Sequence, residues 1–127
     1  MEHKTEHDLR LQGMRILVAD DEFLITVTIE ESFCDAGAEV VTAATLPAAM
    51  KTASGEPLSA ALLDVRLGRQ TTEAVADVLA ARGVPFVFYS GQAPPDHMRE
   101  KHPNAKVLIK PTKQEEIVKM MLQVTAH

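Results

Sequence analysis

The chain has 127 residues, with 46% hydrophobic residues, 24% charged residues and a formal net charge of −5. This length is typical of one globular domain, and no apolar run approaches the length of a membrane span. The acidic balance argues against a surface built to neutralise nucleic-acid phosphates. We therefore expect neither a nucleic acid nor a membrane as a direct partner.

The amino-terminal segment is polar. Residues 1–13 carry many charged side chains and no apolar core, which excludes a secretory signal. We expect a polar leader over residues 1–13, one folded domain over residues 14–127, and a location in the cytoplasm. The single cysteine, Cys34, follows Phe33 in a stretch of helical pattern, where we expect a buried, inert thiol.

Short apolar runs then alternate with longer stretches of helical period. This alternation is typical of an α/β domain with a parallel sheet. Each run is bounded by polar or turn residues, as expected for a strand that is covered on both faces. The predicted strands are Met14–Ala19, Ala38–Thr42, Ala60–Leu63, Pro85–Tyr89 and Lys106–Ile109.

Helices are predicted between these strands. The first covers Glu22–Ala36 and ends at Gly37, because glycine favours the left-handed conformation that closes a helix. The third ends in the same way at Gly83, after apolar residues at helical spacing. The stretch Gly91–Asn104 holds three prolines and almost no apolar stripe, which predicts a short helix there.

The last helix has the strongest helical signal. Its apolar residues recur at positions i, i+3, i+4 and i+7, namely Ile117, Met120, Met121 and Val124. Thr112 followed by Glu115 predicts a capping box at its start. Only this helix follows the fifth strand, so we expect no output domain.

Reactive side chains follow four of the five predicted strands. Asp20 and Asp21 follow the first strand, Asp64 the third, Ser90 the fourth and Lys110 the fifth. The carboxyl ends of parallel strands meet at one edge of a sheet, where α/β proteins bind their ligands. We therefore expect these side chains to form a single site.

The chemistry of these residues points to a phosphoryl group. Three carboxylates at one edge repel one another by roughly 4 kcal/mol per pair at about 4 Å and an effective dielectric near 20, so they need a cation. Oxygen ligands without histidine or thiolate favour a hard ion, here Mg²⁺. Lys110 can pair with an anion, and Ser90 can donate to it. Singly, each residue also has a structural explanation, such as a helix N-cap for Asp21 or a turn for Asp64.

The segments ILVADDE, LLDVRL, FVFYSG and LIKP together resemble the motifs of the receiver domains of bacterial response regulators, the CheY-like family. The resemblance covers nearly all of residues 14–124. It implies a flavodoxin-like (βα)5 three-layer sandwich with a parallel five-stranded sheet of order 2-1-3-4-5. It also implies a stand-alone, single-domain receiver.

The resemblance implies roles for the site residues. Asp64 would be the phosphoacceptor, and Ser90 and Lys110 would hold the phosphoryl oxygens. The implied magnesium ligands are Asp20 (mainly through water), Asp21, Asp64 and the backbone carbonyl of Arg66. In this family the bond between Lys110 and Pro111 is cis.

The implied function is that of a phosphoacceptor in a two-component phosphorelay, which assists its own phosphorylation and dephosphorylation but is not a conventional enzyme. The implied partners are a sensor histidine kinase or histidine phosphotransfer protein and a downstream effector protein. A homodimer through the fourth helix, fifth strand and last helix is a further expectation. The chain departs from many members by having Val107 in place of an aromatic residue, and Tyr89 is expected to be a strand aromatic packed under a helix.

Other interpretations of the sequence remain open. A receiver-like docking module that is never phosphorylated is the main alternative. A haloacid-dehalogenase-like phosphatase is less favoured, because it needs a second aspartate two residues after the first, where this chain has Arg66. A nucleotide- or flavin-binding domain is disfavoured because no glycine-rich loop follows the first strand.

Overall fold

The computed structural model describes residues 9–126. Its centre is a five-stranded parallel sheet built from β1 (Arg15–Ala19), β2 (Glu39–Ala43), β3 (Ala60–Leu63), β6 (Phe86–Ser90) and β7 (Lys106–Ile109). The strands lie in the order β2-β1-β3-β6-β7, which is 2-1-3-4-5 when only the strands of this sheet are counted. The predicted fold class and the predicted strands are confirmed.

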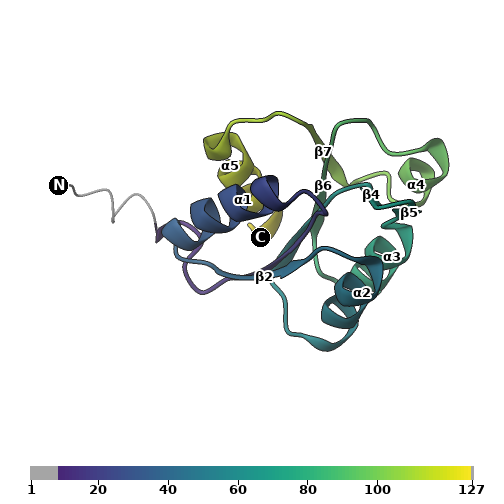
Figure 1. Ribbon diagram of the computed structural model, residues 1–127. Coiled ribbons are helices and arrows are strands. Elements are labelled where there is room, and N and C mark those ends of the chain that lie inside the picture. The colour runs from purple at the N-terminus through teal and green to yellow at the C-terminus, as the bar shows by residue number, and fades with distance from the viewer. Residues whose placement is uncertain (1–8, 127) are drawn as a thin grey trace.

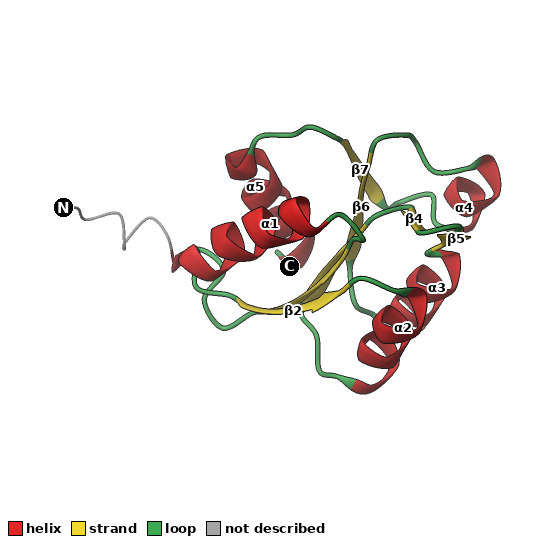
Figure 2. Ribbon diagram, viewed as in Figure 1, coloured by secondary structure: helices red, strands yellow, loops and turns green. Residues whose placement is uncertain are grey.

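Helices cover both faces of this sheet and make a three-layer sandwich (Figures 1 and 2). Helices α1 (Phe23–Asp35) and α5 (Gln114–Thr125) pack on one face. Helices α2 (Leu46–Gly55), α3 (Glu73–Ala81) and α4 (Asp96–Lys101) pack on the other. Helix α4 has 6 residues, which confirms the short helix predicted from its prolines.

The alternation of side chains along β1 explains why its sequence is apolar throughout. Ile16 and Val18 point into the core beneath α1 and α5, whereas Leu17 and Ala19 point into the core beneath α2 and α3. Successive residues of a strand face opposite sides, so a strand covered on both faces has no polar side.

Glycines close two helices as predicted. Gly37 follows α1 with a φ of 98°, and Gly83 follows α3 with a φ of 73°. At Gly37 a second constraint applies, because a Cβ atom would lie 2.9 Å from the Cα of Gln12. The close approach of the amino-terminal segment therefore also requires glycine at this position.

The predicted capping box of the last helix is wrong. Helix α5 begins at Gln114, and its N-cap residue, Lys113, makes no side-chain cap. The Thr112 hydroxyl instead donates a hydrogen bond of 2.7 Å to the carbonyl of Ile109. Thr112 lies in the turn that leads out of β7, so its hydroxyl stabilises this turn rather than the helix.

The expected burial of Cys34 is also wrong. The side chain of Cys34 is exposed, whereas Phe33 beside it is completely buried. Adjacent positions on a helix point about 100° apart, so a helix that turns Phe33 to the sheet turns Cys34 toward its outer surface.

The packed structure begins before residue 14. Leu11 is completely buried beneath α1, and its backbone N–H donates to the carbonyl of Ala36 at 2.7 Å. Residues 1–8 of the expected leader lie outside the described residues. Within residues 9–126, no helix is long and apolar enough to cross a membrane.

A small antiparallel hairpin, which the sequence patterns did not predict, connects β3 to α3. It consists of β4 (Arg66–Leu67) and β5 (Gln70–Thr71), with Gly68 at its tip at a φ of 63°. Strands of two residues are too short to show the alternation by which strands are predicted. This hairpin shapes the site described next.

Candidate functional site

The structure brings the three predicted carboxylates together. Asp20 and Asp21 follow β1, and Asp64 follows β3, its neighbour in the sheet. One carboxylate oxygen from each residue lies within 4.8 Å of the others. Asp20 is buried, Asp64 is partly buried and Asp21 is exposed, so the cluster extends from the end of the sheet to solvent.

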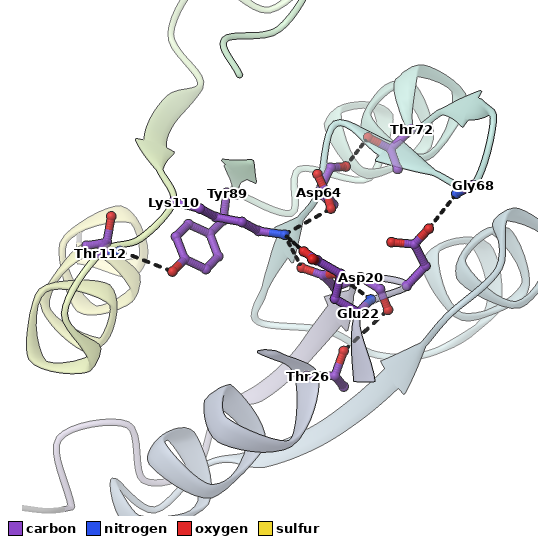
Figure 3. Close-up of polar contacts among 10 residues, drawn as sticks. Asp20, Glu22, Thr26, Asp64, Gly68, Thr72, Tyr89, Lys110 and Thr112 are labelled. Carbon is purple, nitrogen blue, oxygen red and sulfur yellow. Dashed lines mark hydrogen bonds and ion pairs between the residues drawn. The ribbon is translucent and has the colours of Figure 1, made fainter. Parts of the chain in front are cut away.

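Lys110 joins this cluster from the end of β7 (Figure 3). Its ammonium lies 2.9 Å from Oδ2 of Asp20 and 3.1 Å from Oδ2 of Asp64. A third carboxylate, that of Glu22, approaches to 2.6 Å. The ammonium has three N–H donors, and these three acceptors match that number.

Further contacts hold the backbone and the side chain of Lys110 in place. Its backbone N–H donates a hydrogen bond of 2.9 Å to the carbonyl of Ser90, which anchors the end of β7 to β6. Its ammonium lies 5.6 Å from the centre of the Tyr89 ring, within the range of a cation–π contact. The Tyr89 hydroxyl accepts from the backbone N–H of Thr112 at 3.2 Å, so the ring is fixed in turn. Tyr89 is buried in the core beneath α5, as expected of a strand aromatic.

Burial and ion pairing act against each other at this site. Burial raises the pKa of Asp20, although the backbone N–H of Glu22 and the Lys110 ammonium partly offset it. Burial alone would lower the pKa of Lys110, but hydrogen bonds to Glu22 and Asp20 raise it above its ordinary value. Lys110 is therefore a firmly protonated cation beside Asp64.

The hairpin after β3 holds Asp21. The backbone N–H of Gly68 donates to Oδ2 of Asp21 at 2.8 Å. The N-cap explanation does not hold for this aspartate, because the N-cap residue of α1 is Glu22. It is Asp20 whose Oδ1 accepts the backbone N–H of Glu22, at 2.8 Å.

Thr72 holds the backbone of Asp64. This completely buried residue donates its hydroxyl to the Asp64 carbonyl at 2.6 Å, with a longer contact of 3.2 Å to the carbonyl of Val65. Thr72, Gly68 and Glu22 are site residues that were not predicted from the sequence. Only Glu22 has a sequence signal, since it directly follows the acidic pair.

Ser90 and Arg66 lie at the edge of the site. Together with Gln92 they line a cavity of about 410 Å³ between the hairpin and the loop after β6. Among the described residues, the Ser90 hydroxyl makes no hydrogen bond to Asp64 or Lys110. The hydrogen bonds and ion pairs of the Lys110 ammonium with described residues are made to carboxylates, and Arg66 and Ser90 border the space beside them.

The donor set fits a hard divalent cation. Three carboxylates with no histidine or thiolate among them supply only oxygen ligands. The exposed position of Asp21 leaves one side of the cluster open to water, as Mg²⁺ requires because it keeps part of its hydration shell. The bond between Lys110 and Pro111 is cis, as the resemblance implied.

No protein-family model and no curated protein sequence matches the chain. Among solved structures, it is similar to the receiver domain of HemR from Leptospira biflexa, with 22% identity over 91% of this chain and 96% of that one and a TM-score of 0.79. It is similar to chemotaxis protein CheY4 of Vibrio cholerae, with 26% identity over 87% and 98% and a TM-score of 0.74.

A third similar structure is the receiver domain of a sensor histidine kinase from Pseudomonas aeruginosa PAO1, which has a magnesium ion coordinated in its active-site cleft. It shares 23% identity over 89% of this chain and 98% of that one, with a TM-score of 0.76. The chain thus has the flavodoxin-like α/β fold of the CheY-like response regulator receiver domains.

Proposed function

We propose that the chain is a phosphoacceptor receiver of a two-component phosphorelay and that it is phosphorylated on Asp64. The observation that carries this proposal is the 3.1 Å contact between the Lys110 ammonium and Oδ2 of Asp64. A fixed cation beside a carboxylate at the edge of a parallel sheet is suited to an incoming phosphoryl group. The two further carboxylates, Asp20 and Asp21, supply the means to bind a metal ion.

The reaction uses the Asp64 carboxylate as the nucleophile. One of its oxygens attacks the phosphorus of a phosphohistidine on a sensor histidine kinase or histidine phosphotransfer protein. The new O–P bond forms as the P–N bond breaks, and the histidine nitrogen keeps the electron pair of that bond. Lys110 offsets negative charge on the transferring oxygens, and Ser90 donates a hydrogen bond to one of them.

In this proposal Asp21, Asp64 and the backbone carbonyl of Arg66 would hold Mg²⁺ directly, and Asp20 would act mainly through water. When bound, the ion supplies positive charge that offsets the repulsion among the carboxylates and the phosphoryl oxygens. Asp21 is kept in place for this role by the N–H of Gly68, and Asp64 by the hydroxyl of Thr72.

The phosphoryl group is later lost to water. The water oxygen attacks phosphorus, the bond between phosphorus and Asp64 breaks, and inorganic phosphate leaves while the carboxylate is restored. The chain thus assists its own phosphorylation and dephosphorylation, but it is a signalling module of the cytoplasm rather than a conventional enzyme.

The signal passes to a downstream effector protein, and a homodimer forms through α4, β7 and α5. The exposure of β7 supports this surface. It is an edge strand, and its Val107 and Ile109 side chains are 38% and 47% exposed. Static light scattering with and without beryllofluoride tests the dimer, and an unchanged monomer mass would reject it.

The decisive test of phosphorylation is the intact mass after incubation with acetyl phosphate and Mg²⁺. We expect one phosphoryl adduct, which is lost in Asp64→Asn and after chelation of the metal. Asp96→Asn, a change of the same kind at an exposed position, keeps the adduct. If no adduct appears and beryllofluoride also fails to bind, the proposal is rejected in favour of a docking module that is not phosphorylated.

A further inference from the structure

We infer that Glu22 is a positioning residue, which holds the Lys110 ammonium over Asp64 so that it is ready to receive a phosphoryl oxygen. This inference rests on the proposed function and goes beyond it, because Glu22 belongs neither to the predicted site nor to the cluster of three carboxylates. Its carboxylate lies 2.6 Å from the Lys110 ammonium across 88 residues of sequence (Figure 3).

Phosphorylation of Asp64 affects the three carboxylates that contact Lys110 in different ways. One oxygen of Asp64 becomes the bridging oxygen of an acyl phosphate, the carboxyl group loses its charge, and its hydrogen bond with Lys110 weakens. The N–H that pointed to Asp64 is then the donor that can turn to a phosphoryl oxygen. Asp20 and Glu22 keep the other two donors, so together they hold the ammonium in place.

Glu22 differs from Asp20 in what its charge does. The Asp20 carboxylate belongs to the cluster that fits a metal ion, so a bound ion would compete with Lys110 for its charge. The Glu22 carboxylate is not part of that cluster, and within residues 9–126 its ion-pair partner is Lys110. A lysine stem has four rotatable bonds, so an ammonium without this partner samples more positions.

The place of Glu22 in the structure also suits this positioning role. Its backbone N–H is hydrogen-bonded to Oδ1 of Asp20, which fixes the residue at the start of α1. Its side chain makes no cap bond to that helix, and it is 59% exposed. Substitution of the side chain should therefore change the contact with Lys110 and leave the fold intact.

The first test is the affinity for beryllofluoride in the presence of Mg²⁺, compared between the unsubstituted protein, Glu22→Gln and Glu22→Asp. The glutamine keeps the length of the side chain and removes its charge, whereas the aspartate keeps the charge but is too short to reach the ammonium. We expect both variants to bind roughly twofold to tenfold more weakly, because each loses a charge-assisted hydrogen bond at a half-exposed site. Glu31→Gln, the same change at an exposed position on α1, is the matched control and should bind normally.

The second test needs neither metal nor phosphate. In the metal-free protein, we expect the Lys110 ammonium, which contacts three carboxylates, to exchange its protons slowly enough to give a 1H–15N signal. We expect this signal to broaden or vanish in Glu22→Gln and Glu22→Asp and to persist in Glu31→Gln.

The outcomes separate the inference from the proposed function. If the unsubstituted protein binds beryllofluoride and both Glu22 variants bind it equally well or more tightly, the positioning role is overturned and the proposed function stands. If only Glu22→Gln is weakened, the effect is one of charge at a distance and the positioning role is likewise overturned. If the unsubstituted protein neither binds beryllofluoride nor becomes phosphorylated, the positioning role of Glu22 and the proposed function are both rejected.

Discussion

The backbone N–H of Gly68 donates a hydrogen bond of 2.8 Å to Oδ2 of Asp21, and so joins the hairpin after β3 to the acidic pair after β1. The same hairpin begins two residues after Asp64. Two of the proposed magnesium ligands are therefore linked through one short piece of backbone. The position of Asp21 depends on the conformation of Gly68, whose φ of 63° is one that favours glycine.

Substitution Gly68→Ala should weaken magnesium binding and cost stability. A Cβ atom meets nothing within 4 Å at this position, so the effect comes from the backbone. The left-handed conformation costs about 1–2 kcal/mol for a residue other than glycine, and relaxation of the tip moves the N–H away from Asp21. Magnesium titration and urea unfolding measure the two effects.

Gly83→Ala is the matched control. Gly83 also has a positive φ, of 73°, and open space at its Cβ position, but it lies after α3 and contacts no carboxylate of the site. We expect a similar loss of stability and an unchanged affinity for magnesium. Equal magnesium affinity in both variants would show that the hydrogen bond from Gly68 does not position Asp21.

Thr72→Val should destabilise the protein by about 1–3 kcal/mol, because it keeps the shape of a buried side chain and removes the hydroxyl that satisfies the Asp64 carbonyl. It should also slow phosphorylation by acetyl phosphate, since the backbone of Asp64 is less firmly held. Thr28→Val, at an exposed position on α1, is the control and should change neither quantity noticeably. A stable Thr72→Val protein would mean that water replaces the hydroxyl.

The ion pair between α3 and α4 should make stability depend on pH in the acid range. The Lys101 ammonium, 2.5 Å from Glu73, holds the pKa of that carboxyl below its usual value of 4.5. The folded protein thus keeps Glu73 charged at a pH where the unfolded chain binds a proton, so this contribution is full above about pH 4.5 and is lost as the pH falls through the lower, folded-state pKa.

The comparison of the unsubstituted protein with Glu73→Gln measures this contribution. We expect Glu73→Gln to be the less stable protein in urea unfolding at neutral pH, and the difference to close as the pH falls below about 4.5. Glu100→Gln, at an exposed position on α4, should show no such difference. If the difference in the free energy of unfolding between the unsubstituted protein and Glu73→Gln stayed constant with pH, the ion pair would not stabilise the protein.

Leu11 should prove to be part of the core although it lies in a polar stretch. It is completely buried, so Leu11→Ala should lower the free energy of unfolding by about 2–5 kcal/mol. Leu9, two residues earlier, is 47% exposed, and Leu9→Ala should change stability by less than about 0.5 kcal/mol. If the two variants were equally stable, the amino-terminal segment would not be packed as the structure has it.

The sequence by itself determined the five strands of the parallel sheet and the place of the candidate site. Runs such as Ala60–Leu63 and Lys106–Ile109 could be predicted with their bounds, because a strand buried on both faces is apolar throughout and stops where polar residues begin. Asp20, Asp64 and Lys110 could be predicted to meet, because they follow strands whose carboxyl ends share one edge.

Only the tertiary structure decided which groups form hydrogen bonds and ion pairs with the residues of the candidate site. The bond from Gly68 to Asp21 spans 47 residues of sequence, and that from Lys110 to Glu22 spans 88. The same applies to Thr112, whose hydroxyl serves the turn after β7 instead of the predicted cap. The periodicity of apolar residues shows which face of a helix or strand is buried. It does not show which backbone or side-chain group from another helix, strand or loop contacts the polar residues at the end of a strand. Such contacts are set by the packing of distant segments, and that packing exists only in the folded chain.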